Sequence, residues 1–90
     1  PQRRDIAAAI AALVVRLHAA GFRDRNLDLR NLLVQQNGAH LTVAKIDSPR
    51  FRLVGSGHHA DRLADADWQR LLPQLAKFKV ADVAQAHRRR

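Results

Sequence analysis

The stretch NLLVQQNGAHLTVAKID, residues 31–47, decides the fold because it contains two apolar segments and the turn between them. The apolar segments are 32–34 and 41–46, and Asn37-Gly38 lies between them. Asn-Gly is favoured in two-residue type I′ turns, where both central residues need a positive φ. The pattern predicts an antiparallel hairpin that pairs 32–36 with 39–46. Its open end then brings Asn31 close to Asp47.

This juxtaposition sets an amide oxygen beside a carboxylate. Mg²⁺ binds oxygen ligands and commonly takes one or two of them from the protein, while water and phosphate supply the rest. Asn31 and Asp47 are therefore candidate ligands in a magnesium–phosphate site. The residues alone leave open the alternative that both are turn residues that bond nearby backbone.

The segment that precedes the hairpin predicts a helix over residues 5–20, followed by a loop. Alanines fill the helix between apolar residues that repeat at helical spacing, namely Ile6, Ile10, Leu13, Val14 and Leu17. Asp5 fits an N-cap, and Gly21 fits the left-handed residue that ends a helix. Phe22 can then fold back on the last helical turn.

Residues 22–31 alternate charged residues with Leu27 and Leu29 and show no helical face. They predict a structured loop that the two leucines anchor. After the hairpin, Pro49 ends the second strand and residues 50–54 are expected to form a short extended stretch.

The remainder of the chain predicts mainly helix. Residues 60–72 carry an apolar helical face, and Pro73 is expected to kink or restart this helix. Residues 80–90 are expected either to form a last short helix or to fray.

The composition narrows the class of protein. The 90 residues include 16 Lys and Arg against 8 acids, a net charge of +8. This excess suggests polyanionic partners such as nucleic acid or an anionic membrane surface. The absence of cysteine excludes a disulfide framework and a thiol nucleophile, and it favours a reducing, cytoplasmic compartment. No apolar run reaches the length of a transmembrane segment. The lack of methionine predicts a natural start upstream, hence a fragment of a longer chain.

The order of the motifs resembles that of a protein-kinase catalytic core. Kinases carry a loop H-R-D-x-x-x-x-N, a hairpin and then D-F-G. Here 24–26 reads Asp-Arg-Asn, Asn31 follows at the same spacing, and 47–49 reads Asp-Ser-Pro. The sequence around these positions is most similar to the lipopolysaccharide (Kdo/heptose) kinase family, over about residues 10–75. The matching segments are Leu17-His18-Ala19-Ala20-Gly21-Phe22, Arg25-Asn26-Leu27, Asn31-Leu32-Leu33-Val34, Ile46-Asp47, Arg50 and Trp68-Gln69-Arg70-Leu71-Leu72.

The resemblance implies an α+β fold that forms the core of a protein-kinase-like carboxy-terminal lobe, with the amino-terminal lobe absent. Residues 1–90 are then a single partial domain. Its parts are a helix at 5–20, a catalytic loop at 21–31, a hairpin at 32–46, a metal-Asp segment at 47–59 and a helical region at 60–90. The implied activity is ATP-dependent phosphorylation of a hydroxyl on a lipid-linked sugar, at the inner face of the cell membrane.

The resemblance also implies roles for individual residues. Asn31 and Asp47 would hold Mg²⁺ that bridges the phosphates of ATP, and Arg25 would brace the catalytic loop. Asn26 stands where the family has its catalytic Asp, and an amide is not a base at neutral pH. Either Asp24 or Asp28 could supply the missing carboxylate.

Two other functions stay open. The first is a pseudokinase, a binding or scaffold module that keeps the fold without phosphoryl transfer. The second, ranked far behind, is a small basic module that binds nucleic acid. The glycine-rich loop and the lysine and glutamate of the amino-terminal lobe have no counterpart here. This chain alone is therefore not expected to hold ATP tightly, and an exposed lobe interface should make it poorly soluble or dimeric.

Overall fold

The computed structural model describes residues 2–89. Within this range the chain has an α+β fold with three α-helices and two small antiparallel sheets. The elements are α1 (Gln2–Ala19), β1 (Phe22–Arg23), the short 3₁₀ helix η1 (Leu29–Asn31), β2 (Leu32–Asn37), β3 (His40–Lys45), β4 (Arg52–Leu53), α2 (His58–Ala76) and α3 (Ala81–Arg88). None of the helices described is both long and apolar enough to cross a bilayer.

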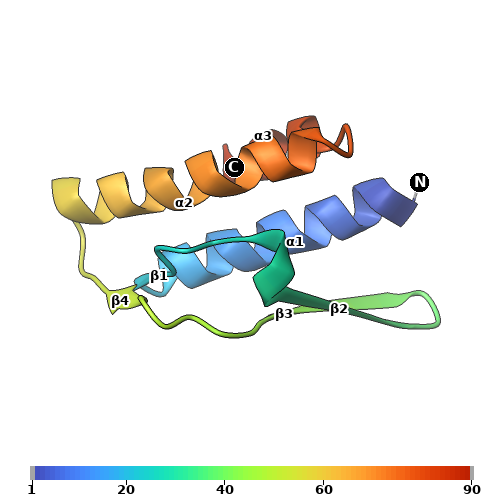
Figure 1. The fold of residues 1–90 in the computed structure, drawn as a ribbon, viewed down its shortest axis with the longest axis horizontal. Helices are drawn as coiled ribbons and strands as arrows, with labels where there is room; N and C mark the ends of the chain where they lie inside the picture. Colours follow the sequence, from blue (N-terminus) through green and yellow to red (C-terminus); the bar gives the residue numbers. More distant parts are fainter. Residues whose placement is uncertain (1, 90) are drawn as a thin grey trace.

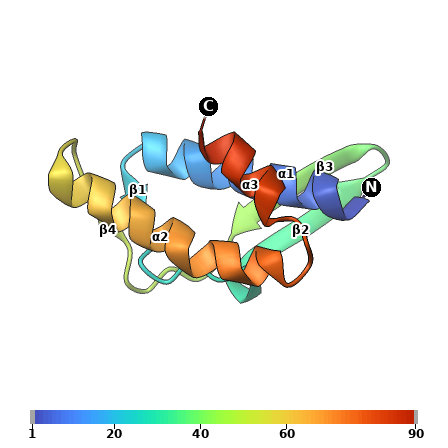
Figure 2. The same ribbon diagram turned by 90° about the horizontal axis from the view of Figure 1, so that it is seen from above.

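Helix α1 is the middle layer, with α2 and α3 on one side and the β2–β3 hairpin on the other (Figure 1). The chain reverses after α2, so that α3 packs back on α1 (Figure 2). The core lies between these layers. Its buried residues are Ala7, Ile10, Ala11, Val14, Leu27, Val43, Trp68, Leu71, Leu75, Val80 and Ala84.

The apolar face of α1 is confirmed in part. Ile10 and Val14 are buried as expected, whereas Leu13 is only partly buried. Ala11 of α1 is completely buried, as is Ala84 of α3. Helices α1 and α3 pack on each other, and small side chains let two helices approach closely. Alanines that were expected only to fill the helix are therefore part of the core.

One prediction at the ends of α1 is wrong, and one is confirmed. Because the helix begins at Gln2, Asp5 lies within its first turn and is not the N-cap. Gly21 ends the helix with a φ of 89°, as expected. Phe22 enters β1, and its ring stacks on Phe51 with the centroids 5.4 Å apart.

The β2–β3 hairpin forms as predicted, but its turn is shifted by one residue. Asn37 pairs with His40, so the central turn residues are Gly38 and Ala39. Gly38 has a φ of 61°, whereas Asn37 and Ala39 are not left-handed. A single glycine at the first central position fits a type II′ turn and not the predicted type I′ turn.

The second half of the chain follows its predicted outline. The short extended stretch is β4, which pairs with β1. Helix α2 runs from His58 to Ala76 without a break at Pro73, so it is longer than the predicted 60–72. Helix α3 corresponds to the short helix expected after residue 80, while Arg90 lies outside the described residues.

Candidate functional site

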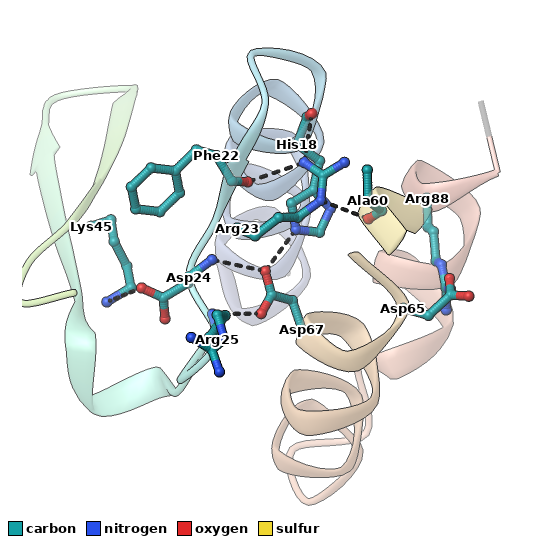
Figure 3. A network of polar contacts seen from close by, with 10 residues as sticks. All are labelled: His18, Phe22, Arg23, Asp24, Arg25, Lys45, Ala60, Asp65, Asp67 and Arg88. Atoms are coloured by element: carbon teal, nitrogen blue, oxygen red, sulfur yellow. Dashed lines mark hydrogen bonds and ion pairs between the residues drawn. The ribbon is translucent and has the colours of Figure 1, made fainter. Parts of the chain in front are cut away.

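A buried carboxylate on α2 organises the loop that precedes the hairpin. Asp67 is 2% exposed and accepts hydrogen bonds from the backbone N–H groups of Asp24, at 3.1 Å, and Arg25, at 2.9 Å. The His18 Nε2 atom lies 2.9 Å from the same carboxylate (Figure 3). These donors satisfy a group that would otherwise be costly to bury. The backbone at 24–25 is thereby fixed to α2.

A second side chain of α2 holds the other end of the loop. Gln74 lies seven residues after Asp67 and therefore on the same side of the helix. Its Oε1 atom accepts a hydrogen bond from the backbone N–H of Leu29 at 2.9 Å. Between these two attachments Leu27 is buried in the core. The predicted structured loop is confirmed in part. It is shorter than expected, because β1 and η1 occupy its ends, and Leu27 is buried whereas Leu29 is only partly buried. Helix α2 adds two polar attachments to it.

Arg23 joins the end of α1 to the start of α2. This buried side chain donates from Nε to the carbonyl of Ala60, at 3.0 Å, and from Nη1 to the carbonyl of His18, at 2.8 Å. The His18 ring also meets Trp68 edge-on, with the ring centroids 6.1 Å apart. His18 and Arg23 therefore have packing and capping roles that stiffen the entrance to the loop.

Two residues implicated by the resemblance have left-handed backbones. Arg25 has a φ of 65° and Asp47 a φ of 59°, and neither is glycine. Such conformations are unfavourable for L-residues and persist where the surroundings hold them. At Arg25 the holding contact is the hydrogen bond of its N–H to Asp67, while its side chain is exposed.

The two carboxylates considered as substitutes for the missing Asp differ in their surroundings. Asp24 is 2% exposed, and neither of its oxygens makes a hydrogen bond within residues 2–89. The Lys45 Nζ atom lies 3.3 Å from Asp24 Oδ1, an ion pair without hydrogen-bond geometry. Asp24 is thus a buried carboxylate with one cationic neighbour.

Asp28 caps the 3₁₀ helix η1. Its Oδ1 atom accepts hydrogen bonds from the Arg30 N–H, at 3.0 Å, and from Arg30 Nε, at 3.2 Å. The backbone N–H of Arg30 and then its guanidinium lower the pKa of the Asp28 carboxyl, and the Arg70 charge adds to this. A carboxylate with a lowered pKa is a weaker base. Asp28 is thus committed to the cap of η1.

Asn31 and Asp47 are neighbours at the open end of the hairpin. The backbone N–H of Ile46 donates to the carbonyl of Asn31 at 2.9 Å, which sets Asp47 one residue away. Asn31 Nδ2 donates to the carbonyl of Asn26 at 3.5 Å, and among residues 2–89 its Oδ1 atom accepts no hydrogen bond. Asp47 is exposed.

Amide and carboxylate oxygens suit Mg²⁺, so the donor chemistry at this end of the hairpin fits the ion. Within residues 2–89, no three His, Cys, Asp or Glu side chains converge as a metal-binding group. A magnesium ion bound by Asn31 and Asp47 would therefore take its other ligands from water and phosphate.

The sequence pattern does not predict site roles for Asp67, Gln74 or Lys45. A signal for Asp67 was present, because Leu63, position 67 and Leu71 are spaced by one helical turn and Asp67 is the charged member of this apolar row. An acid on the buried face of a helix requires partners, and those partners lie here in the loop. Lys45 and Gln74 carry no comparable local signal.

No family model, curated protein or solved structure matches the chain. Its function is therefore inferred from the residues and from their geometry.

Proposed function

We propose that the chain is the catalytic-loop segment of an ATP-dependent phosphotransferase of the lipopolysaccharide kinase type. The observation that carries the proposal is the way the loop is held. Asp67 binds its backbone at 24–25, and the hairpin bonds its last residue, Asn31, beside Asp47. Phosphoryl transfer depends mainly on positioning and on charge stabilisation, so a loop fixed at both ends supports this chemistry.

In this proposal Asn31 and Asp47 hold Mg²⁺. The bound ion would neutralise charge on the phosphates of ATP. Asp67 and Gln74 do not touch the nucleotide, and they keep the loop in one conformation while substrates exchange. The acceptor is a hydroxyl of a lipid-linked sugar, a substrate class that comes from the resemblance. A net charge of +8 suits work at an anionic membrane surface.

The direct test is transfer of the γ-phosphoryl group of ATP to a lipid-linked sugar by the full natural protein that carries these residues. The Asp47→Ala variant should lose at least about a hundredfold in rate, because it removes a ligand of the metal. Asp61→Ala, at an exposed position in the first turn of α2, is the matched control and should keep its rate. A wild-type protein that neither binds nor uses Mg–ATP would contradict the proposal.

A second candidate function is the pseudokinase, and the surroundings of the acids favour it. Asn26 cannot accept a proton, Asp24 is buried beside Lys45, and Asp28 is engaged by Arg30. In this alternative the protein binds nucleotide or a partner without transfer.

The Asn26→Asp variant separates the two functions. General-base catalysis contributes about 10²–10⁴-fold, so a gain in phosphotransfer of that size would show a site that lacks only its carboxylate. If the variant binds Mg–ATP but transfers no faster than the wild type, the pseudokinase is the better description.

A further inference from the structure

Lys45 joins the loop before the hairpin to the segment after it. Its side chain is 7% exposed, and its Nζ atom donates to the carbonyls of Ile46, at 2.9 Å, and Asp47, at 2.8 Å. The same atom lies 3.3 Å from the buried carboxylate of Asp24. Figure 3 shows the Lys45 side chain extending from the hairpin to Asp24. An ammonium has three N–H groups, and Lys45 has three oxygen neighbours within contact distance.

We propose that Lys45 is a positioning residue that fixes Asp47 in the conformation needed to bind Mg–ATP. This inference rests on the proposed function and adds to it a residue that the motif does not contain. Lys45 would act through the backbone of Asp47 and would not touch the nucleotide.

The backbone of Asp47 needs such support. Its φ of 59° is one that L-residues rarely adopt, and its own side chain is exposed. The N–H of Ile46 is bonded to Asn31, which fixes the chain on one side of Asp47. The hydrogen bond from Lys45 fixes the Asp47 carbonyl on the other side. Together these contacts restrict the direction in which the Asp47 carboxylate leaves the chain.

The stability of the fold alone does not explain why the Lys45–Asp24 ion pair is buried here. Burying an ion pair removes two charges from water, and an apolar pair of similar size is often equally stable or more so. An apolar residue at position 45 could fill the space, but it could not bond the carbonyl of Asp47. Asp24 has the complementary task, because it neutralises the buried ammonium.

The test compares Lys45→Met, Asp24→Asn and the double variant in the full natural protein. Lys77→Met, at an exposed position after α2, is the matched control. Thermal unfolding measures the structural effect, and calorimetric titration with Mg–ATP measures the dissociation constant. Lys45→Met should lower Tm, because it leaves Asp24 buried without a cation. The double variant has no buried charge at this place and should recover at least half of that loss.

The dissociation constant should behave differently from Tm. We expect it to rise at least tenfold in both variants that lack Lys45, while Lys77→Met stays within threefold of wild type. If Lys45→Met does not fold, the dissociation constant of the double variant decides the test.

Two results would overturn the inference in distinguishable ways. A double variant that binds Mg–ATP as tightly as wild type would show that Lys45 only balances charge, and the proposed function would stand. A wild-type protein that does not bind Mg–ATP would overturn the proposed function together with the role of Lys45.

Discussion

At the residue scale, the buried carboxylate of Asp67 accepts hydrogen bonds from two backbone N–H groups and contacts His18. Truncation to Ala would leave buried donors without an acceptor. We expect Asp67→Ala to lower the free energy of unfolding by about 3 kcal/mol in urea denaturation at pH 7. Asp65→Ala is the control, because this side chain is 58% exposed and pairs only with Arg88 at the surface. It should cost less than about 1 kcal/mol, and equal losses in the two variants would contradict the role of Asp67.

Asp28 gives a prediction of pH dependence. Its hydrogen bonds to Arg30 lower its pKa in the folded protein below the ordinary value of 3.8. The folded state therefore gains stability from the ionised carboxyl above that value, and the gain is lost as the pH falls through the lowered pKa. Asp28→Asn should reduce the loss of unfolding free energy on acidification, measured by urea denaturation from pH 6 to pH 2.5. The exposed control Asp61→Asn should keep the wild-type acid slope, and an unchanged slope in Asp28→Asn would count against the capping contact.

Some of the site could be predicted from the sequence at this scale. The nearness of Asn31 to Asp47 follows from local hairpin chemistry, and the structure confirms it. The difference between Asp24 and Asp28 could not be predicted. The carboxylate of Asp24 is paired with Lys45, which is distant in the sequence. The carboxylate of Asp28 is hydrogen-bonded to Arg30, which is only two residues away. Only the folded arrangement shows which acid is buried and which one caps a helix.

At the scale of elements, the joint between α1 and the β1–β4 sheet depends on Gly21. A Cβ atom at this position would lie 2.6 Å from the carbonyl oxygen of Val54, and the φ of 89° is unfavourable for other residues. The carbonyl of Gly21 also accepts the Val54 N–H at 2.8 Å, so the two strands cannot simply separate. Gly21→Ala should therefore destabilise the protein by more than about 2 kcal/mol.

Two other glycines provide graded controls for this prediction. Gly38→Ala, at a φ of 61° in an open turn, should cost about 1 kcal/mol. Gly55→Ala should be close to neutral, because its φ is not left-handed and nothing lies within 4 Å of its Cβ position. Urea denaturation of the three variants measures the series. A Gly21→Ala variant no less stable than Gly55→Ala would show that the joint is not as tight as described.

The hairpin shows how far local rules reach at this scale. Asn37-Gly38 correctly predicts two strands with a tight turn, but Gly38 takes the first central position. The shift of the turn by one residue moves every cross-strand pair by two residues, which keeps each side chain on its face. Asn31 consequently lies opposite Ile46, directly beside Asp47. The position of the turn was therefore wrong by one residue. The predicted turn would have set Asn31 opposite Ala44, and the observed register brings Asn31 closer to Asp47.

At the scale of the whole molecule, apolar surface remains exposed on the hairpin, around the β1–β4 sheet and in the turn after α2. The exposed large apolar residues are Leu33, Val34, Ile46, Phe51, Leu53 and Phe78. An open apolar cavity of about 840 Å³ also lies between the first half of α1, β2 and the turn after α2. Surfaces of this kind favour association. We expect residues 1–90, expressed alone, to self-associate in sedimentation velocity at micromolar concentrations.

Leu53→Lys is the sharpest variant for that prediction, because this side chain is 73% exposed and contributes little to the core. It should shift the chain toward monomer without loss of helical content in circular dichroism. A chain that is already monomeric at high concentration would contradict the expectation.

The α+β class could be predicted at this scale, but the packing of the layers could not. The pattern of apolar residues indicates helices at both ends and a hairpin between them. Helix α3 packs on α1, and the core contains residues as distant in the sequence as Ala11 and Ala84, whereas alanine carries little directional signal. The buried face of α2 likewise includes Asp67, whose hydrogen-bond partners are present only once the loop is in place.

The central claim is that the open end of the hairpin binds Mg–ATP, and thermal unfolding of the full natural protein tests it most directly. Ligand at a hundred times its dissociation constant should stabilise the folded state by about 2.7 kcal/mol, a shift of several degrees in Tm. We predict this shift for the wild type and its loss in Asp47→Ala. The same Tm for the wild-type protein with and without Mg–ATP would contradict the claim.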